Sequence, residues 1–411
     1  MPTGERALWI LADDLSGAAD CAAAFAAGRG PVAVVLGEAT LQPRSVAIDT
    51  DSRAMDRGSA TAVVTRAFAR LPRGGGGGPL VYKKIDSTLR GHVAAELRAA
   101  LDAAPQFAGA VVAPSFPEQG RALSGGKLCL HGRPVQEPAG DLMGMLAAAG
   151  LRPALLRQPM ADPVQVRRQI EQAMAGGARA VVVDATGSGD LAQLAEALLA
   201  PVAPWLPAGS AGLARALARH IAPAGGVQDA KPFACGGPVL ALVGSFSPAS
   251  ASQVRYLEAS DAAQVIRLDG AQWLAAQGAD ARRQAIAKAC EALRNGRNVA
   301  LAIAGEVVQP FSRDRVQAMA RAATALLPHA GTCILTGGDT ARALFDELGV
   351  SRLDVVGEWE PGISLARVPA AATPGFVLKA GAFGDAQALQ RIIACFGGSR
   401  RPATARESAP S

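Results

Sequence analysis

The sequence predicts an α/β protein of two domains, each with a mainly parallel sheet flanked by helices. Short apolar runs alternate with Ala-, Leu- and Arg-rich helical patterns along the whole chain, which is typical of βαβ units. The chain has 411 residues, more than one ordinary hydrophobic core accommodates. A Pro- and Gly-rich break at 222–237 interrupts the alternation, which then begins again. We therefore expect domains at 1–225 and 238–398, a linker at 226–237 and a disordered tail at 399–411.

The expected strands are apolar runs of three to five residues, each followed by polar or Gly-rich sequence. In the first half they are Ala7–Leu11, Val32–Leu36, Ser45–Ile48, Leu80–Tyr82, Ala110–Ala113 and Ala180–Val183. In the second half they are Val239–Val243, Val299–Ile303, Cys333–Leu335, Asp354–Val356 and Phe376–Leu378. In open α/β sheets ligands bind outside the carboxyl ends of the strands. The residues that follow each run are therefore the candidate functional residues.

Composition excludes several classes of protein. No apolar run reaches the length of about 18–20 residues that a membrane span requires, and the first ten residues lack the apolar core of a secretory signal. The net charge of +6 comes from scattered basic residues, and aromatic residues make up only 4%, which argues against nucleic-acid binding. None of the six cysteines forms a CxxC motif, so zinc is not expected. Free thiols suit a cytoplasmic protein.

Two carboxylates follow the first expected strand. Asp13 and Asp14 stand directly before a helical pattern, where one of them can cap the helix and the other is left to bind a metal or accept a proton. Arg53 ends the polar segment at 49–53, which follows the third strand. A guanidinium group binds a carboxylate through two parallel hydrogen bonds.

The segment Tyr82–Gly91 concentrates charge between a strand and the helical pattern His92–Leu101. It contains Lys83, Lys84, Asp86 and Arg90 together with two hydroxyls. We expect Ser87 or Thr88 to cap the helix, whose first N–H groups would form an anion site. A short run of mixed charge at a strand end indicates a functional site rather than a solvated surface.

The second half carries glycines and hydroxyls at its strand ends instead of charges. Three loops have this composition: 244–248, 336–341 and 379–384. Glycine lets backbone N–H groups approach a phosphate closely, and a helix N-terminus adds a favourable dipole. The chain has no Walker A motif and no GxGxxG at its first βα unit, and the run Gly74–Gly78 is expected to be a surface connection. The three loops together predict a cradle for nucleotide phosphates.

The division of chemistry between the two halves favours phosphoryl transfer. A charged cleft in the first half would orient a small anion and supply a base, and the Gly-rich cleft would hold ATP, with Mg2+ carried mainly by the nucleotide. We hypothesise that Arg53 and the pair Lys83 and Lys84 hold the substrate carboxylate and the transferred phosphoryl group. Either Asp14 or Asp86 would then accept the proton of the acceptor hydroxyl.

Several segments resemble those of the four-carbon acid sugar kinase family, which includes D-threonate, D-erythronate and 3-oxo-tetronate kinases. They are ADDLSGAAD, DTDSR, KKIDSTLRG, APSFPEQGR, GSFSPASASQ, TGGDTARAL, EPGI and LKAGAFG, spread over residues 10–384. The resemblance implies that the N-terminal domain binds the acid sugar, that the C-terminal domain binds ATP, and that the active site lies in the interdomain cleft. It also implies phosphorylation of the 4-hydroxyl, with D-threonate as the first expected acceptor and 3-oxo-tetronate, D-erythronate or 4-hydroxythreonine as alternatives.

The resemblance also assigns residues. The implied substrate contacts are Asp13, Asp14, Arg53, Lys83, Lys84, Ile85, Asp86 and Arg90, with Asp14 and Asp86 as candidate catalytic carboxylates. The implied nucleotide contacts are Ser245, Gly337, Gly338, Asp339, Thr340, Gly381 and Ala382. No residue is implied as a dedicated metal ligand.

Two other classes of function stay open at this point. A non-catalytic sensor of nucleotide and sugar acid would bind both ligands without releasing ADP. An NAD-dependent dehydrogenase would require the dinucleotide motif that ADDLSGAAD does not supply. The expected partner is a small acid sugar, with no nucleic acid and no membrane, and the choice between monomer and homodimer is left open.

Overall fold

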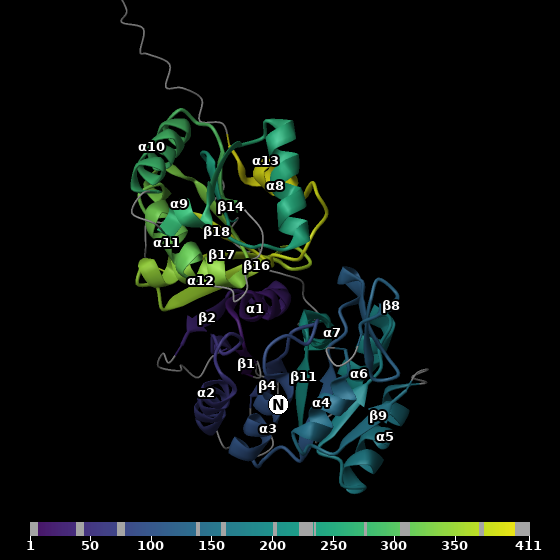
Figure 1. Cartoon of the computed structure of the whole chain (residues 1–411). Helices are drawn as coiled ribbons and strands as arrows, with labels where there is room; N and C mark the ends of the chain where they lie inside the picture. The colour runs from purple at the N-terminus through teal and green to yellow at the C-terminus, as the bar shows by residue number, and fades with distance from the viewer. Residues whose placement is uncertain are drawn as a thin grey trace, which may run out of the picture. The chain divides into compact units, whose positions relative to one another are not determined.

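The computed structural model divides the chain into two compact units (Figure 1). The first unit comprises residues 1–230 and 351–369, and the second comprises 231–350 and 370–411. The structure describes residues 7–37, 45–71, 79–136, 140–157, 162–199, 204–221, 233, 236–274, 278–304, 313–369 and 374–398. The run Gly74–Gly78, the tail 399–411 and most of the expected linker 226–237 lie outside these ranges.

The first unit is built on one long sheet. Its strand order is β17-β16-β2-β3-β1-β4-β11-β5-β10-β9, and every pair from β2 to β9 is parallel. The strands are β1 (Leu8–Ala12), β2 (Val32–Leu36), β3 (Val46–Asp49), β4 (Leu80–Lys84), β5 (Gly109–Ala113), β9 (Pro153–Leu156), β10 (Ala180–Val183), β11 (Trp205–Gly209), β16 (Arg352–Glu360) and β17 (Ile363–Arg367). Because helices cover both faces, the central strands are buried along their whole length.

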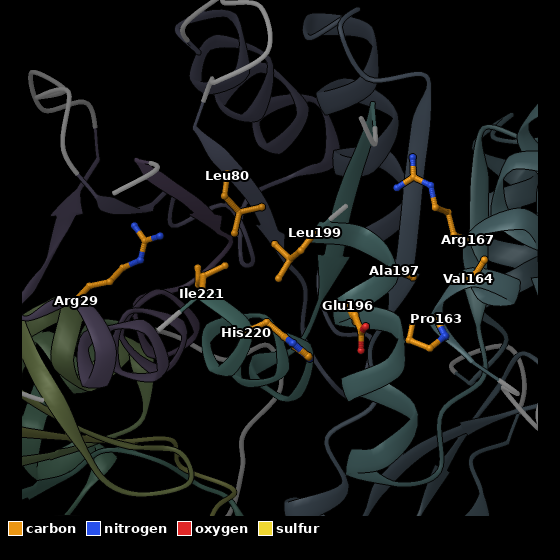
Figure 2. Close-up of a pocket in the computed structure, with 10 residues that line it drawn as sticks. All are labelled: Arg29, Leu80, Pro163, Val164, Arg167, Glu196, Ala197, Leu199, His220 and Ile221. Carbon is orange, nitrogen blue, oxygen red and sulfur yellow. The ribbon is translucent and has the colours of Figure 1, made fainter. Parts of the chain in front are cut away.

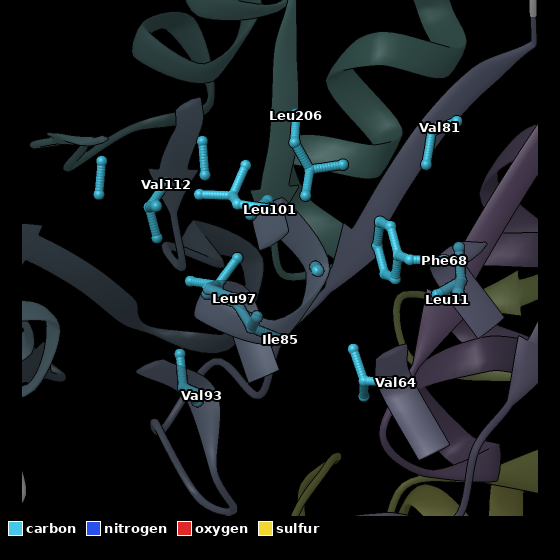
Figure 3. Packing of buried hydrophobic residues seen from close by; sticks show 14 of the residues in the cluster. Leu11, Val64, Phe68, Val81, Ile85, Val93, Leu97, Leu101, Val112 and Leu206 are labelled. Atoms are coloured by element: carbon cyan, nitrogen blue, oxygen red, sulfur yellow. The ribbon is translucent and has the colours of Figure 1, made fainter. Parts of the chain in front are cut away.

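The helices of the first unit join successive strands. They are α1 (Leu15–Arg29), α2 (Arg57–Ala69), α3 (Val93–Ala103), α4 (Leu142–Ala148), α5 (Pro163–Ala175), α6 (Ser188–Leu199) and α7 (Ala211–Ile221). Figure 3 shows part of the core on one face, where Phe68 of α2 and Leu97 and Leu101 of α3 pack against Leu11, Val81 and Val112. A short turn η1 (Pro117–Gln119) and a small antiparallel sheet of β6 (Arg121–Ser124), β7 (Lys127–Leu130) and β8 (Arg133–Pro134) follow β5.

The hairpin β16–β17 belongs to the first unit although it comes from the second half of the sequence. β16 runs antiparallel to β2, with Arg352 opposite Val35 and Val355 opposite Val32. The pairing covers the edge of the parallel sheet and buries Leu353 and Val355 completely. The expected second domain at 238–398 is therefore interrupted, because the strand expected at Asp354–Val356 completes the sheet of the first unit.

The second unit has a smaller sheet whose strands are all parallel. The order is β13-β14-β12-β15-β18, with β12 (Val239–Val243), β13 (Gln264–Asp269), β14 (Val299–Ala304), β15 (Thr332–Thr336) and β18 (Gly375–Lys379). The helices are α8 (Pro248–Ser260), α9 (Gly270–Leu274), α10 (Ala279–Arg294), α11 (Asp314–Ala323), α12 (Gly338–Glu347) and α13 (Ala388–Phe396), with a turn η3 (Leu327–His329).

The α/β class and every expected strand are confirmed, three of them (Val32–Leu36, Ala180–Val183 and Val239–Val243) at both ends and the others with ends that shift by one to a few residues. Strands missing from the expectation are β6 to β9, β11, β13 and β17. Several of these are short or half-exposed and carry prolines or charges, so their apolar pattern is weak. In the described ranges, no helix combines the length and the apolar character that crossing a bilayer requires.

Candidate functional site

Charged side chains gather where β1, β3 and β4 end in the first unit. The parallel register aligns Ala12 with Asp49 and Leu11 with Lys83, so the residues that follow these strands meet at one edge of the sheet. Arg53 lies at the centre of the group. Its Nε and Nη2 donate to the two oxygens of Asp13 at 2.7 and 2.8 Å, and its Nη1 donates to Asp14 Oδ2 at 2.7 Å. Asp86 Oδ2 lies 3.4 Å from Nη2.

The three carboxylates around Arg53 have different electrostatic environments. Burial tends to raise the pKa of each. Burial is the largest single effect on Asp13 and Asp86, but Arg53 and the other nearby cations together outweigh it. The pKa of Asp13 is therefore lowered, and the pKa of Asp86 lies well below its usual value. For Asp14 burial prevails over Arg53, and the neighbouring charge of Asp13 acts in the same direction, so the pKa of Asp14 is raised. Asp14 is therefore the most basic carboxylate of the group.

Asp14 caps a helix, and its side chain is also partly exposed to solvent. It is the N-cap of α1, and its Oδ1 accepts a hydrogen bond from Gly17 N at 2.9 Å. Its side chain is 16% exposed, against 4% for Asp13 and 6% for Asp86. The expectation that the carboxylate not used as a cap would be left free is wrong, because Asp13 is held by two hydrogen bonds from Arg53.

Lys83 and Lys84 do not act as a pair, because neighbouring residues of a strand point to opposite faces of the sheet. Lys83 Nζ lies on the α3 side, 2.8 Å from Glu96 Oε2, and both side chains are almost fully buried. Lys84 lies on the α1 side, where its Nζ is 2.7 Å from the point that a Cβ on Gly17 would occupy. Among the described residues no side chain forms an ion pair with Lys84 Nζ. Its charge nevertheless acts on Asp13, Asp14 and Asp86.

A buried network of hydrogen bonds links the ends of β1, β3 and β4. Thr50 Oγ1 donates to Ala12 O at 2.8 Å and lies 2.9 Å from Ser52 Oγ, which donates to Glu96 Oε1 at 2.6 Å. Glu96 thus joins the loop after β3 to Lys83 at the end of β4. Glu96 is absent from the predicted site residues, since a glutamate inside a helical pattern is ordinarily exposed.

The turn after β4 is built around Asp86. Its carboxylate accepts hydrogen bonds from Thr88 N at 2.9 Å and from Arg90 Nη2 at 2.7 Å. Leu89 has a φ of +61° and Gly91 one of +82°, and such left-handed backbone at a non-glycine residue is costly and concentrates at functional sites. A Cβ on Gly91 would lie 3.2 Å from Asp13 Oδ2. The turn therefore brings the chain close against the Asp13–Arg53 pair.

Three expectations for this segment need correction or refinement. Neither Ser87 nor Thr88 caps α3, because the N-cap is His92, which makes no side-chain cap bond. Ser87 Oγ accepts a hydrogen bond from Arg121 Nη1 instead. The side chain of Ile85 lies in the apolar core, and its N–H donates to Gly209 O at 2.9 Å. By contrast Arg90, with a side chain that is 60% exposed, is open to solvent.

A second buried charge cluster joins the hairpin to α1 and α7. Arg215 of α7 donates to Asp20 of α1 at 3.1 Å and to Glu358 of β16. Burial raises the pKa of Glu358 to about 7, and Asp20 reinforces this while Arg215 opposes it. Two carboxylates share one guanidinium here, which favours a proton on one of them. This cluster is absent from the predicted site, because it connects helices and a strand that are far apart in the chain.

In the second unit, Ser245, Gly337 and Gly381 come together at the ends of β12, β15 and β18. A Cβ on Gly337 would lie 3.3 Å from Ser245 Cβ, and a Cβ on Gly381 would overlap Ser245 Oγ. Gly337 is the N-cap of α12 with a φ of +99°. Glycine is therefore required at both positions, one for its conformation and one for the close approach.

Two predicted nucleotide contacts have structural partners. Thr340 is buried, and its Oγ1 donates to Thr336 O at 2.9 Å. The Asp339 carboxylate lies 3.0 Å from Arg313 Nη2. These side chains orient the first turn of α12, whose N-terminus adds a favourable dipole for an anion. Gly338, at the first helical position, places only backbone there.

The loop after β18 has its carbonyl groups bound from within the protein. Ser247 and Ser250 donate to Gly381 O, and Gln253 Nε2 lies 3.0, 3.2 and 2.9 Å from the carbonyl oxygens of Phe383, Gly384 and Asp385. In the described part of the chain, no group accepts a hydrogen bond from the N–H groups of Gly381, Ala382 or Gly384. A loop whose carbonyls are bound and whose N–H groups are available is a candidate anion-binding site.

A separate hollow in the first unit lies away from the charged residues. It has a volume of about 590 Å³, and Leu80, Pro163, Val164, Glu196 and His220 are among the residues that line it (Figure 2). Leu80 is the first residue of β4, so the hollow lies at the amino end of the strand and not at the carboxyl end. The described residues contain no cluster of three or more His, Cys, Asp or Glu side chains arranged around a metal ion.

The protein is thus an α/β protein with a charged cluster in its first unit and a candidate anion site made of backbone groups in its second unit. Comparison with known proteins agrees. Residues 8–217 match the family model described as "Sugar-binding N-terminal domain", and residues 240–389 match the "Nucleotide-binding C-terminal domain". The chain belongs to the four-carbon acid sugar kinase family, as its sequence motifs suggested.

Relatives in this family align over nearly the whole chain. A D-threonate kinase of Cupriavidus necator is 37% identical over 96% of this chain and 99% of its own length. A D-threonate kinase of Bordetella bronchiseptica is 33% identical over 93% and 95%, and a 3-oxo-tetronate kinase of Methylobacterium radiotolerans is 30% identical over 94% and 98%. A solved structure from Salmonella typhimurium LT2 shares the fold, with a TM-score of 0.76 and 22% identity over 95% of this chain and 99% of that one.

Proposed function

We propose that this sugar-acid kinase transfers the γ-phosphoryl group of ATP to the 4-hydroxyl of a four-carbon acid sugar, with D-threonate as the preferred acceptor. The observation that carries the proposal is that one chain contains both a charged cluster at the strand ends of the first unit and a loop with available N–H groups in the second unit. The D-threonate kinases at 37% and 33% identity support this choice of acceptor.

Lys84 and Arg90 are the cations best suited to the anionic groups of the substrate. Arg53 is surrounded by three carboxylates and Lys83 is paired with Glu96, so both hold the site together. Lys84 has no comparable partner in the described residues, and Arg90 is exposed beside Asp86. A guanidinium can bind a carboxylate with two hydrogen bonds, and a lysine suits a phosphoryl group.

Asp14 is the proposed proton acceptor for the C4 hydroxyl. A general base works best when its pKa is raised toward the working pH, and burial raises the pKa of Asp14. Asp86 is a weaker candidate, because Arg53 and Arg90 hold its pKa well below the usual value. We therefore assign Asp86 to positioning Arg90 and Arg53.

The nucleotide phosphates would bind backbone groups at Gly337, Gly338, Gly381 and Ala382, with Ser245 between the two loops. The carbonyl groups of the loop after β18 already accept hydrogen bonds from within the protein, so its available N–H groups are left to bind such an anion. ATP supplies the phosphoryl group, and Mg2+ ordinarily arrives with the phosphates and takes only one or two protein carboxylates. Asp339 and Thr340 would orient the first turn of α12 and make no direct contact through their side chains.

Gly17→Ala tests the role of Lys84 without changing any charge. The new Cβ would lie 2.7 Å from Lys84 Nζ and 2.8 Å from Asp14 Oδ1, so both the ammonium group and the Asp14 carboxylate must shift. Alanine favours a helix over glycine by about 1 kcal/mol, so the fold should persist. We expect KM for the acid sugar to rise about tenfold or more, corresponding to about 1.4 kcal/mol, with KM for ATP unchanged. Gly58→Ala in α2, which meets only Asp56 at 3.2 Å, is the control, and equal KM values in both variants would contradict the role.

A screen of acceptors tests the function directly. ADP release is measured with D-threonate, D-erythronate, 3-oxo-tetronate and 4-hydroxythreonine, and the product is examined by phosphorus NMR for coupling to the C4 protons. We expect the highest kcat/KM with D-threonate and phosphate on C4. Tight binding of both ligands without ADP release would instead support a sensor, and a higher kcat/KM for another acid would reassign the substrate.

A further inference from the structure

Lys379 is a buried lysine in the second unit, directly before the loop that follows β18. It is the last residue of β18, and only 1% of its surface is exposed. It stands opposite Thr336 of β15 in the parallel register, so the two side chains lie on the same face of the sheet. Its Nζ donates to Ala380 O at 3.1 Å, which is the first carbonyl of the loop described above.

The side chain of Lys379 lies directly beneath that loop. Lys379 Cε is 3.8 Å, and Gln253 Nε2 3.3 Å, from the point that a Cβ on Gly384 would occupy. The ammonium group and the Gln253 amide thus share the space under the loop. Gln253 Oε1 and Thr336 Oγ1 are both buried without a hydrogen-bond partner in the described structure, so the space offers polar atoms that a charged lysine can use.

No acidic group compensates the charge of Lys379 in the described part of the unit. The charged residues of the surrounding elements are paired with one another: Asp385 with Arg391 of α13 at 2.8 Å, and Asp339 of α12 with Arg313 at 3.0 Å. The residues that reach the loop from α8 and its N-cap are uncharged, namely Ser247, Ser250 and Gln253. Burial alone lowers the pKa of Lys379 to about 7.

We propose that Lys379 is the cation that neutralises the phosphates of the bound nucleotide from beneath the loop, and that it takes up a proton when the nucleotide binds. The inference rests on the proposed function in one respect, namely that ATP binds to the second unit.

Burying the charged form of Lys379 without a negative partner costs free energy. Before nucleotide binds, the neutral amine of Lys379 is favoured, since no acidic side chain in the described part of the unit balances the ammonium group. Phosphates bound to the N–H groups on the outer side of the loop would bring negative charge to within a few ångströms, where the interior screens it weakly. The bound state therefore favours the protonated lysine. Affinity for ATP should fall as pH rises above about 7, because Lys379 must then take up its proton from a solution with a lower proton concentration.

Calorimetric titration of the full chain with MgATP, in the absence of acid sugar, measures the proton directly. At pH 8 the phosphates of ATP are already fully ionised, and titrations in buffers of different ionisation enthalpy give the number of protons taken up. We expect about half a proton or more per ATP for the unaltered protein, as a lysine with a pKa of about 7 is mostly neutral at this pH. Lys379→Met should abolish the uptake and weaken MgATP binding at least tenfold. Lys288→Met, at an exposed position of α10, is the matched control and should change neither quantity.

Lys379→Arg adds a second test that does not depend on the stability of the methionine variant. Arginine keeps its charge at every accessible pH, so MgATP binding to this variant should show no proton uptake and no dependence on pH between 7 and 9. Uptake of less than a tenth of a proton by the unaltered protein, or the same uptake in Lys379→Met or Lys379→Arg, would overturn the proposal. Failure of MgATP to bind the unaltered protein at all would instead contradict the proposed function.

Discussion

Asp14→Asn should lower kcat by about 10²- to 10⁴-fold, the range over which a general base contributes to catalysis. Asparagine is as good an N-cap as aspartate, so the hydrogen bond from Gly17 N to position 14 should persist. The substitution removes the proton-accepting charge and also the hydrogen bond that Arg53 Nη1 donates to Asp14 Oδ2. Arg53 keeps both hydrogen bonds to Asp13, and the fold and the affinity for ATP should change little. Steady-state kinetics with the preferred acid sugar, together with a thermal melt, measure the two effects separately.

Two further variants make the result interpretable. Asp162→Asn makes the same substitution at the N-cap of α5, where Oδ1 accepts from Gln165 N at 2.8 Å, and it should leave kcat unchanged. Asp86→Asn removes the partner of Arg90 and should chiefly raise KM for the acid sugar and lower stability. If Asp14→Asn kept kcat within a few fold of the unaltered protein while Asp86→Asn lost it, the base would be Asp86.

Lys83→Met should destabilise the first unit by about 3–5 kcal/mol, the usual cost of leaving a buried charge without its partner. Glu96 is only 2% exposed, and the remaining hydrogen bond from Ser52 Oγ does not replace a full positive charge. Urea denaturation followed by circular dichroism measures the change, analysed as two transitions because the chain has two compact units.

The double variant Lys83→Met with Glu96→Leu separates the charge effect from loss of packing. Replacing both members of a buried pair with apolar groups is often nearly neutral, so most of the lost stability should return. Glu171→Gln, in the exposed pair with Arg167, should cost less than about 1 kcal/mol. A Lys83→Met protein of full stability with a raised KM for the acid sugar would show that Lys83 contacts the substrate.

Much of the architecture could be predicted from the sequence. The apolar runs locate the strands because a parallel sheet covered on both faces requires continuous apolar strands. The charged and Gly-rich residues that follow the runs locate both candidate sites, because the carboxyl ends of parallel strands meet at one edge. Asp14, Arg53 and Asp86 are brought together at the predicted edge, as are Ser245, Gly337 and Gly381.

The roles within each cluster could not be read from the sequence, because they depend on which side chains are already paired. Arg53 is surrounded by carboxylates from two other strand ends, and Lys83 is paired with a glutamate on α3. Lys84, the next residue, faces α1 instead. Pairing determines both the burial cost and the pKa of each group, and the partners come from distant parts of the chain.

By itself, the sequence determined the α/β class, the positions of most strands and the motifs that indicate a sugar-acid kinase. Only the tertiary structure decided that the hairpin β16–β17 completes the first unit, that Glu96 and Arg215 hold buried ion pairs, and that Lys379 lies uncompensated beneath a loop held by Gln253. The physical reason is that local patterns report which residues are apolar or form a strand. Burial and charge compensation arise only when segments far apart in the sequence pack together.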